Sequence, residues 1–335
     1  MRYVITLDSG TTNTRMILLN EDDEPVHSAK VPVGVRDTAI DGNLGKLVSG
    51  VRECLDKILR QKQIDYSDIK CVIASGMITS ELGLADIPHI PAPAGIEELA
   101  GHMQKRCFPE ICPLPIYFIP GIKNCLSEVG QENFTDMDMM RGEETESAAL
   151  IRRFYDGRRM LLILPGSHTK FVEADNRGRI TGCATSMAGE LLAVLTKETI
   201  LAKAVEYKFV NEQDYDRDMV LLGYKTAEKI GVSAACFQGR VLKTYVYEDY
   251  KKIANYILGA VLQNDIMLME RGRIASSVWD RDIIVSGKNP FRRALFDIIM
   301  SEGRYDQVTE YIPKAGEIPL SAEGALMAAR IRGII

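Results

Sequence analysis

The chain has 335 residues, of which 46% are hydrophobic and 26% are charged. This length suits about two domains of ordinary size, and the composition argues against a disordered, collagenous or coiled-coil protein. The 41 basic and 46 acidic residues leave a net charge of −5 without a basic stripe, which argues against nucleic-acid binding. No apolar run approaches about 18 residues, and an early polar turn interrupts the N-terminus before a signal peptide could form. We therefore expect a cytoplasmic protein with no membrane or nucleic-acid partner.

The cysteines and histidines do not form a recognisable framework. Seven cysteines give an odd number with no C-x-x-C pair, and the four histidines are dispersed among them. Disulfide and zinc frameworks need regularly spaced ligands. We therefore expect reduced, partly buried thiols.

Strands and helices alternate along the first part of the chain. Apolar runs at 3–7 and 16–19 flank a polar turn and predict a hairpin. Residues 44–59 have the spacing of a helix with one buried face. Further patterns predict strands at 69–74 and 116–119 and a helix at 95–105. This alternation indicates an α/β architecture.

A second hairpin pattern follows the apolar run 160–164. VITLDSGTTNTRMILLNEDDEP and LLILPGSHTKFVEADNRGRI share a strand, a Gly turn, hydroxyl residues, a cation and a returning strand. Two copies of one plan suggest two related domains facing each other, and we place their boundary between Pro120 and Asp138. The domains predicted are 1–130, with the first turn, and 131–335, with the second. The latter also contains helical patterns and a strand, at 189–203, 215–230, 233–245, 250–270, 282–285 and 291–300.

The first turn, DSGTTNTR, has the residues of a phosphate-binding loop. Gly10 leaves backbone N–H groups unobstructed after a buried strand. Asp8 can hold a divalent cation through water, and Arg15 can neutralise a transferring phosphoryl group. The other phosphate donors expected here are Thr11, Thr12 and Asn13. A plain β-turn whose side chains bond their own backbone is the alternative.

The second turn, PGSHTK, offers similar donors. We expect it to bind phosphate through Gly166, Ser167, His168, Thr169 and Lys170. For His168, a structural hydrogen bond within the turn is an equal alternative. Finding both turns in one chain strengthens the phosphate interpretation of each.

The sequence Arg141-Gly142-Glu143-Glu144 opens an expected helix that runs through Phe154. Arg141 can bind a substrate carboxylate as a planar two-pronged donor. A carboxylate beside an attacking hydroxyl can take its proton during phosphoryl transfer, and a helix N-terminus favours the ionised form of such a group. An ordinary capped helix start with a surface ion pair is the alternative.

The paired turns resemble those of the actin, Hsp70 and sugar-kinase superfamily. DSGTTNTR, SGMITS, PAPAG, DMMRGEETE, LPGSHTK and AGEL are similar, in order, to segments of the 2-dehydro-3-deoxygalactonokinase family over about the first 200 residues. This resemblance implies two ribonuclease H-like α/β domains flanking an interdomain ATP cleft. It also implies transfer of the ATP γ-phosphate, with Mg2+ at Asp8, to the 6-hydroxyl of 2-dehydro-3-deoxy-D-galactonate in galactonate breakdown.

Further site residues follow from the same resemblance. GEETESAAL resembles the GDQQAAL-type segment of carbohydrate kinases, which implies Glu143 as the base, with Asp138 as the alternative. Arg141 and Glu144 are expected at the sugar acid. Sugar-side loops at strand ends are expected to contribute Ser75, Gly76 and Met77, although packing explains Met77 equally well. Gly287, after the last buried strand, is expected near adenine, or else merely caps that strand.

The sequence departs from the family pattern in three places, of which the two at usually aromatic positions concern the walls of the sugar pocket. Ser9 and Phe171 stand where an aromatic residue and Trp are usual, and AGEL stands for TGEL. The phosphate donors are retained, so these departures bear on the substrate rather than on phosphoryl transfer. Two alternatives remain: a kinase for a related sugar acid or sugar, and a non-catalytic ATP-binding regulator. A homodimer is left open.

Overall fold

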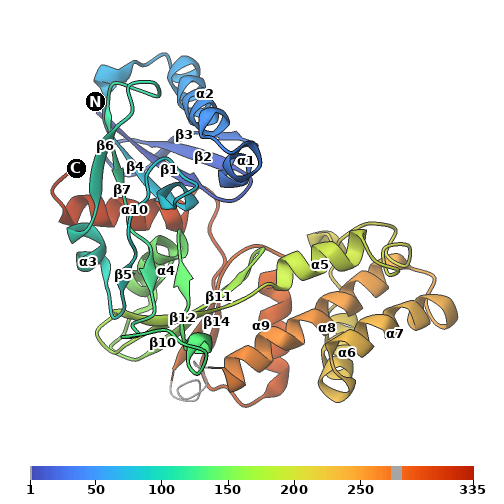
Figure 1. The fold of residues 1–335 in the computed structure, drawn as a ribbon. Coiled ribbons are helices and arrows are strands. Elements are labelled where there is room, and N and C mark those ends of the chain that lie inside the picture. The colour runs from blue at the N-terminus through green and yellow to red at the C-terminus, as the bar shows by residue number, and fades with distance from the viewer. Residues whose placement is uncertain (1, 273–280) are drawn as a thin grey trace. The chain divides into compact units, whose positions relative to one another are not determined.

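The computed structural model describes residues 2–272 and 281–335, and contacts divide the chain into two units. Unit 1 contains Met1–Gly157, Gly178–Gly182 and Pro313–Ile335, and unit 2 contains Arg158–Arg177 and Cys183–Ile312. Each unit is built around its own twisted sheet (Figure 1).

Unit 1 has a six-stranded sheet in the order β3-β2-β1-β4-β7-β6. The first three strands form an antiparallel meander, because each turn between them is short and polar. β4 and β7 run parallel to β1. The strands are β1 Tyr3–Ser9, β2 Thr14–Leu19, β3 Pro25–Val31, β4 Ile69–Gly76, β6 Gln104–Cys107 and β7 Pro115–Phe118.

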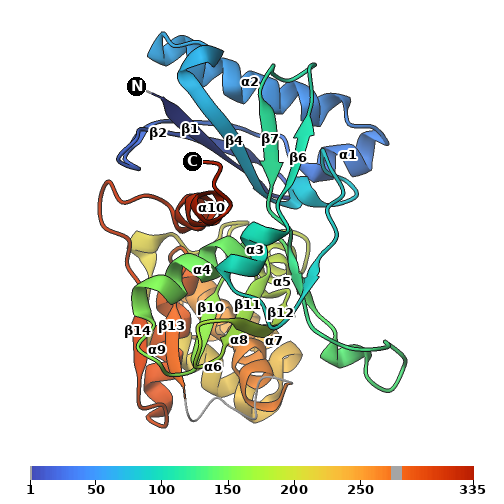
Figure 2. The same cartoon turned by 90° about the vertical axis from the view of Figure 1, so that its left-hand side faces the viewer.

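Helices cover this sheet. Leu47, Val51 and Leu55 recur at helical spacing and bury one face of α2 against β2 and β3. α10 lies beside α4 and α3 and contacts β1 and β4 (Figure 2). The helices of unit 1 are α1 Val35–Asp41, α2 Gly45–Lys62, α3 Ile96–Gly101, α4 Glu143–Phe154 and α10 Leu320–Ile331.

Short elements complete unit 1. Unit 1 also has a small sheet in the order β5-β8-β9, and its loops contain single turns of 3-10 helix. They are β5 Ile90–Pro91, β8 Ile122–Lys123, β9 Met139–Met140, η1 Tyr66–Asp68, η2 Met77–Thr79 and η3 Phe134–Asp136.

The grouping of α4 with unit 1 differs from the domain division expected from sequence, which placed residues 131–157 in the second domain. α10, from the C-terminus, packs so closely on α4 that a Cβ at Gly324 would overlap Thr145. Arg153 at the end of α4 also bonds Glu317 and Glu323. The sequence pattern could not reveal this return of the chain.

Unit 2 repeats the plan of unit 1. Its sheet has the order β12-β11-β10-β13-β14, in which the first residues of β12 are grouped with unit 1. β10 and β11 are antiparallel, and β13 and β14 run parallel to β10. In both sheets an antiparallel hairpin comes first in the chain, and later strands are added parallel to the first strand of that hairpin. This shared order confirms the internal repeat and the two ribonuclease H-like α/β domains. The strands are β10 Met160–Leu164, β11 Thr169–Ala174, β12 Ile180–Ser186, β13 Asp282–Val285 and β14 Val308–Glu310.

A group of helices follows β12 in unit 2. α8 is buried along most of its length and packs on α5, α6, α7 and α9. Gly223 and Gly259 let α6 and α8 approach backbone to backbone. No helix among the described residues is long and apolar enough to cross a membrane. These elements are α5 Ala188–Lys197, η4 Glu212–Asp214, α6 Arg217–Ile230, α7 Val232–Tyr245, α8 Tyr250–Arg271 and α9 Phe291–Glu302.

Most elements predicted from sequence are confirmed, with two shortened helices. The helix expected at 95–105 ends at Gly101, because Gln104–Cys107 pairs with β7 and tertiary pairing overrides the local pattern. The helix expected at 189–203 ends at Lys197. All seven cysteines are free, and five of them are buried, as expected.

Candidate active site

The first turn connects β1 to β2 as predicted. Gly10 N donates to Asn13 O at 2.9 Å, and the Thr12 hydroxyl accepts from Asn13 Nδ2 at 2.8 Å. Beneath the turn, the buried hydroxyls of Ser9 and Thr14 are 2.9 Å apart. Thr11 and Thr12 are exposed, so their hydroxyls are accessible to a ligand.

The N-terminus of α1 holds this turn from behind. Val35 N donates to Gly10 O at 3.2 Å, and Arg36 N donates to Thr11 O at 2.9 Å. A Cβ at Gly34 would lie 2.5 Å from both carbonyl oxygens, closer than real Cβ atoms come. We call Gly34 and these two N–H groups the first brace. Sequence analysis missed it, although a glycine directly before a short helix is its visible signal.

Asp8 lies at the carboxyl end of β1, next to the end of β4. It pairs in register with Ser75 on one side and with Arg15 on the other. Gly76 has φ +87°, and a Cβ there would lie 2.9 Å from Asp8 Oδ1. Gly142, with φ +110°, approaches Gly76 in turn. The structure therefore brings Asp8, Ser75, Gly76 and the start of α4 together within unit 1.

Two other predicted residues have different surroundings. Arg15 is on the sheet beside Asp8 and lines a groove of about 380 Å³ with Lys30, Glu317 and others. Met77 packs against the core of unit 1, which favours the packing interpretation.

The guanidinium of Arg141 is occupied by protein acceptors. Nη1 donates to Thr79 O at 2.5 Å and to its hydroxyl at 2.8 Å, while Nη2 donates to Ile87 O at 2.8 Å. Nη2 also lies 3.3 Å from His89 Nδ1. The side chain is only 9% exposed, and burial lowers its pKa. Arg141 thus ties the loop after β4 to the start of α4, and its role as a two-pronged donor to a substrate carboxylate stays a prediction.

Replacing Arg141 should therefore destabilise the protein. Arg141→Met leaves the Thr79 and Ile87 carbonyls without their donors, which we expect to cost about 2–4 kcal/mol. Chemical denaturation measures the loss. Arg152→Met, an exposed position near the end of α4, is the matched control, with an expected change within about 0.5 kcal/mol. Equal stabilities for the two variants would contradict this role.

The three carboxylates near the start of α4 differ in environment. Glu144 is fully buried, and its Oε2 accepts from Gly142 N at 2.7 Å. Burial, followed by the charge of Glu143, raises the pKa of Glu144 well above its ordinary value. Glu143 is half-buried, as is Asp138, whose Oδ1 accepts from Met139 N at 2.6 Å. Glu144 thus shapes the backbone before α4, and its predicted place at the sugar acid stays a prediction.

The second turn connects β10 to β11. Ser167 is exposed, whereas Thr169 is fully buried at the start of β11. Lys170 is 7% exposed, and its Nζ donates to Thr185 Oγ1 at 2.5 Å. His168 Nε2 is 3.3 Å from Glu190 Oε1 of α5, outside the turn.

The start of α5 braces the second turn in the way that α1 braces the first. Glu190 N donates to Ser167 O at 3.1 Å. A Cβ at Gly189 would lie 2.7 Å from Ser167 Cα and closer still to Gly166 O. Gly189 and the N–H group of Glu190 form the second brace. The repeat therefore extends from the strands to the support of each turn.

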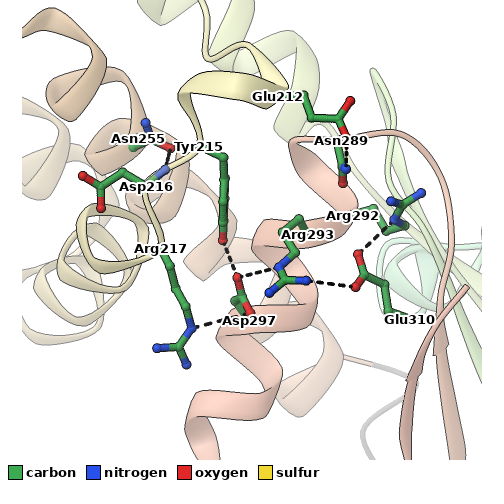
Figure 3. A network of polar contacts seen from close by, with 10 residues as sticks. All are labelled: Glu212, Tyr215, Asp216, Arg217, Asn255, Asn289, Arg292, Arg293, Asp297 and Glu310. Carbon is green, nitrogen blue, oxygen red and sulfur yellow. Dashed lines mark hydrogen bonds and ion pairs between the residues drawn. The ribbon is translucent and has the colours of Figure 1, made fainter. Parts of the chain in front are cut away.

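Gly287 lies beside the second turn. It has φ +101°, and a Cβ there would lie 2.9 Å from Pro165 O. Arg292 Nη1 donates to Gly287 O, and Arg292 Nε donates to Glu310 Oε1, both at 3.0 Å. Figure 3 shows this pair within a larger network in which Asn289 bonds Glu212. The turn after β13 is therefore fixed by buried charged groups.

Asp8 is the metal-binding candidate from the sequence. Among residues 2–272 and 281–335, no group of three or more His, Cys, Asp or Glu side chains could enclose a metal ion. Mg2+ usually binds one or two carboxylates, with water and substrate phosphates filling its other positions. A single carboxylate at a strand end beside a hydroxyl-rich turn fits that donor set.

Comparisons with known proteins agree with these features. A model of the family described as 2-keto-3-deoxy-galactonokinase matches residues 8–303. A "probable 2-dehydro-3-deoxygalactonokinase" of Rhizobium meliloti (strain 1021) is 28% identical over 204 residues, 61% of this chain and 59% of that one. The 2-dehydro-3-deoxygalactonokinase of Escherichia coli (strain K12) is 28% identical over 201 residues, 60% of this chain and 58% of that one. The chain thus spans less than two thirds of the length of these curated relatives.

Solved structures share the fold. A crystal structure of a "putative 2-dehydro-3-deoxygalactonokinase protein" from Sinorhizobium meliloti has a TM-score of 0.75 at 21% identity, with 98% of each chain covered. An activator of 2-hydroxyisocaproyl-CoA dehydratase from Clostridium difficile, with bound ADPNP, has a TM-score of 0.51 at 15% identity, with 99% of this chain and 96% of that one covered.

Proposed function

Because the chain belongs to the 2-keto-3-deoxy-galactonokinase family, we propose that it transfers the γ-phosphate of ATP to the 6-hydroxyl of 2-dehydro-3-deoxy-D-galactonate. The observation that carries this proposal is the extent of the family match, which includes Asp8, both turns, the start of α4 and Gly287. The reaction would serve sugar-acid breakdown in the cytoplasm.

In this proposal both turns bind ATP phosphates. The exposed hydroxyls of Thr11, Thr12 and Ser167 supply donors, together with backbone N–H groups of the turns. Mg2+ bound at Asp8 would neutralise phosphate charge. Gly287 has a positive φ and packs closely on Pro165 of the second turn, which leaves no space for a Cβ, and it would border adenine there. The remaining phosphate-binding candidates are Gly10, Asn13, Gly166, His168, Thr169 and Lys170.

The acceptor side of the proposed site belongs to unit 1. Glu143 would take the proton of the sugar hydroxyl, and Asp138 is the alternative base. Ser75 and Gly76 would border the sugar, since they neighbour Asp8. Arg15 remains a candidate for stabilising the transferring phosphoryl group. Arg141 and Glu144 would act by positioning the start of α4, given their hydrogen bonds to Thr79 and Gly142.

A coupled ADP-release assay over a panel of sugar acids tests the proposal. We expect turnover with 2-dehydro-3-deoxy-D-galactonate, and mass spectrometry with NMR should place the phosphate on the 6-oxygen. Faster turnover of a related 2-keto-3-deoxy sugar acid would change the substrate but keep the reaction. ATP binding without turnover on any acid would favour the non-catalytic regulator.

The two braces give a further prediction. Gly189→Ala and Gly34→Ala each force a Cβ into the carbonyl oxygens of a phosphate turn, so we expect ATP affinity to fall about tenfold or more. Gly101→Ala is the matched control, because a Cβ there meets nothing within 4 Å. Nucleotide titration measures the effect. If both brace variants bound ATP as tightly as Gly101→Ala does, the braces would not determine the geometry of the turns.

A further inference from the structure

A buried acidic residue, not singled out by sequence analysis, lies behind the second turn. Asp265 of α8 is fully buried, and Asp265 Oδ1 accepts a hydrogen bond from Ser186 Oγ at the end of β12. The Thr169 hydroxyl, at the start of β11, also faces this carboxyl and lowers its pKa. One carboxyl group therefore interacts with both strands beside the second turn.

Both hydroxyl partners of Asp265 are linked to the second turn, one through the turn's own chain and the other through α5. Thr169 directly follows His168 of the turn. Ser186 is separated from the first residue of α5 by Met187 alone, and Gly189 of α5 packs against Gly166 and Ser167. A shift of the Asp265 carboxyl would therefore move the turn itself and its brace together.

The cluster is costly to the fold. Asp265 Oδ2 and Thr169 Oγ1 are buried, and neither has a well-formed hydrogen bond to any residue that the structure describes. Burial raises the pKa of Asp265 to about 6, against the opposing effects of the Ser186 hydrogen bond and of the nearby Thr169 hydroxyl. An amide or apolar side chain would fill the same place without a buried charge. Costly groups of this kind are concentrated at functional sites.

We propose that Asp265 is a positioning residue for the second phosphate turn, which it holds in its binding geometry through Ser186 and Thr169. The inference rests on the proposed function, since it assigns this turn to the phosphates of ATP. Asp265 acts only through its two hydroxyl partners, so its effect should be confined to ligands that reach the turn.

Nearby charged groups have other partners. On β11, Lys170 donates to Thr185 and Glu173 pairs with Arg281. Glu190 of α5 contacts His168. Among the described residues, no charged side chain of α5, α6, α7, α9, β11 or β12 adds to the causes of the Asp265 pKa shift, which are burial and the two hydroxyls. The pH dependence of the turn can therefore be tested at Asp265, and His168→Gln serves as the control because His168 is the histidine of the turn.

The sign of the pH effect distinguishes positioning from stability. Folded Asp265 holds its proton more tightly than the unfolded chain does, so the folding free energy becomes less favourable as pH rises from about 4 to 6. Asp265→Asn removes that loss, and its melting temperature at pH 7.5 should equal or exceed that of the wild type. Phosphate binding should show the opposite trend, because the ionised carboxylate presents an acceptor oxygen to each hydroxyl, whereas protonation turns one of these oxygens into a donor.

Calorimetric titration of the full chain with Mg·AMP-PNP and with AMP tests the inference. AMP lacks the β- and γ-phosphates and serves as the ligand that does not reach the turn. For Asp265→Asn, and for Ser186→Ala, we expect the Kd of AMP-PNP to rise about tenfold or more and that of AMP to change less than about twofold. Wild-type affinity for AMP-PNP should fall below about pH 6; this response should persist in His168→Gln and disappear in Asp265→Asn.

Three outcomes would overturn the inference. Unchanged AMP-PNP affinity in Asp265→Asn would exclude a positioning role. Equal losses for AMP and AMP-PNP together with a lower melting temperature would reduce Asp265 to a structural residue. Absence of nucleotide binding by the wild type would instead refute the proposed function, and this inference with it.

Discussion

Asp8→Asn should lower turnover at least about 100-fold, the usual scale for losing a charged catalytic group. Asp8 lies at the end of β1, and its Oδ1 is so close to Gly76 that a residue with a Cβ could not replace this glycine. The amide keeps the shape of the carboxylate but loses the charge that would hold Mg2+. We therefore expect a lower kcat and a higher Mg2+ concentration for half-maximal activity, while the fold stays unchanged.

Steady-state assays across a range of Mg2+ concentrations measure both effects. Asp56→Asn is the matched control, since Asp56 lies on α2 beside Arg60 and away from the strand ends. Its rates should equal those of the wild type. If Asp8→Asn also turned over at the wild-type rate, the metal assignment and the phosphate interpretation of the first turn would both be wrong.

Features that depend on neighbouring residues in the chain could be predicted from the sequence. The hairpins at 3–19 and 160–174 are specified by apolar runs around a Gly turn, and the structure has them as β1–β2 and β10–β11. The repeat, the α/β class and the start of α4 at Glu143 follow from the same local patterns. Phosphate turns belong to this class because backbone geometry, set within a few residues, determines them.

Features that depend on distant partners could not be predicted. The acceptors of Arg141 lie on a loop after β4, far away in sequence, so nothing near Arg141 indicates that its donors are occupied. α4 joins unit 1 because α10 returns from the C-terminus. In the sequence, Asp265 is one polar residue of a long helix, and only the structure shows Ser186 and Thr169 beside it. Burial and long-range pairing, rather than local propensity, decide these cases.

The choice of base depends on the environments at the start of α4. Glu144 is fully buried, and its Oε2 accepts a hydrogen bond from Gly142 N, so it is poorly placed to meet a substrate hydroxyl. Asp138 directly precedes the short strand β9, and its Oδ1 accepts a hydrogen bond from Met139 N. Glu143 is the first residue of α4, where the helix dipole favours a carboxylate, and it follows Gly142, which touches the Asp8–Gly76 region.

Glu143→Gln should therefore lower kcat at least about 100-fold, because the amide cannot accept the proton of the sugar hydroxyl. Asp138→Asn is the matched comparison and should keep most of the activity. Single-turnover measurement of ADP and sugar phosphate separates the chemical step from product release, and the KM for ATP should change little in either variant. A large loss in Asp138→Asn with near-normal rates in Glu143→Gln would transfer the role of base to Asp138. Comparable losses in both would mean that the proton leaves through a pair of carboxylates, whose joint titration would then set the acid limb of the pH–rate profile.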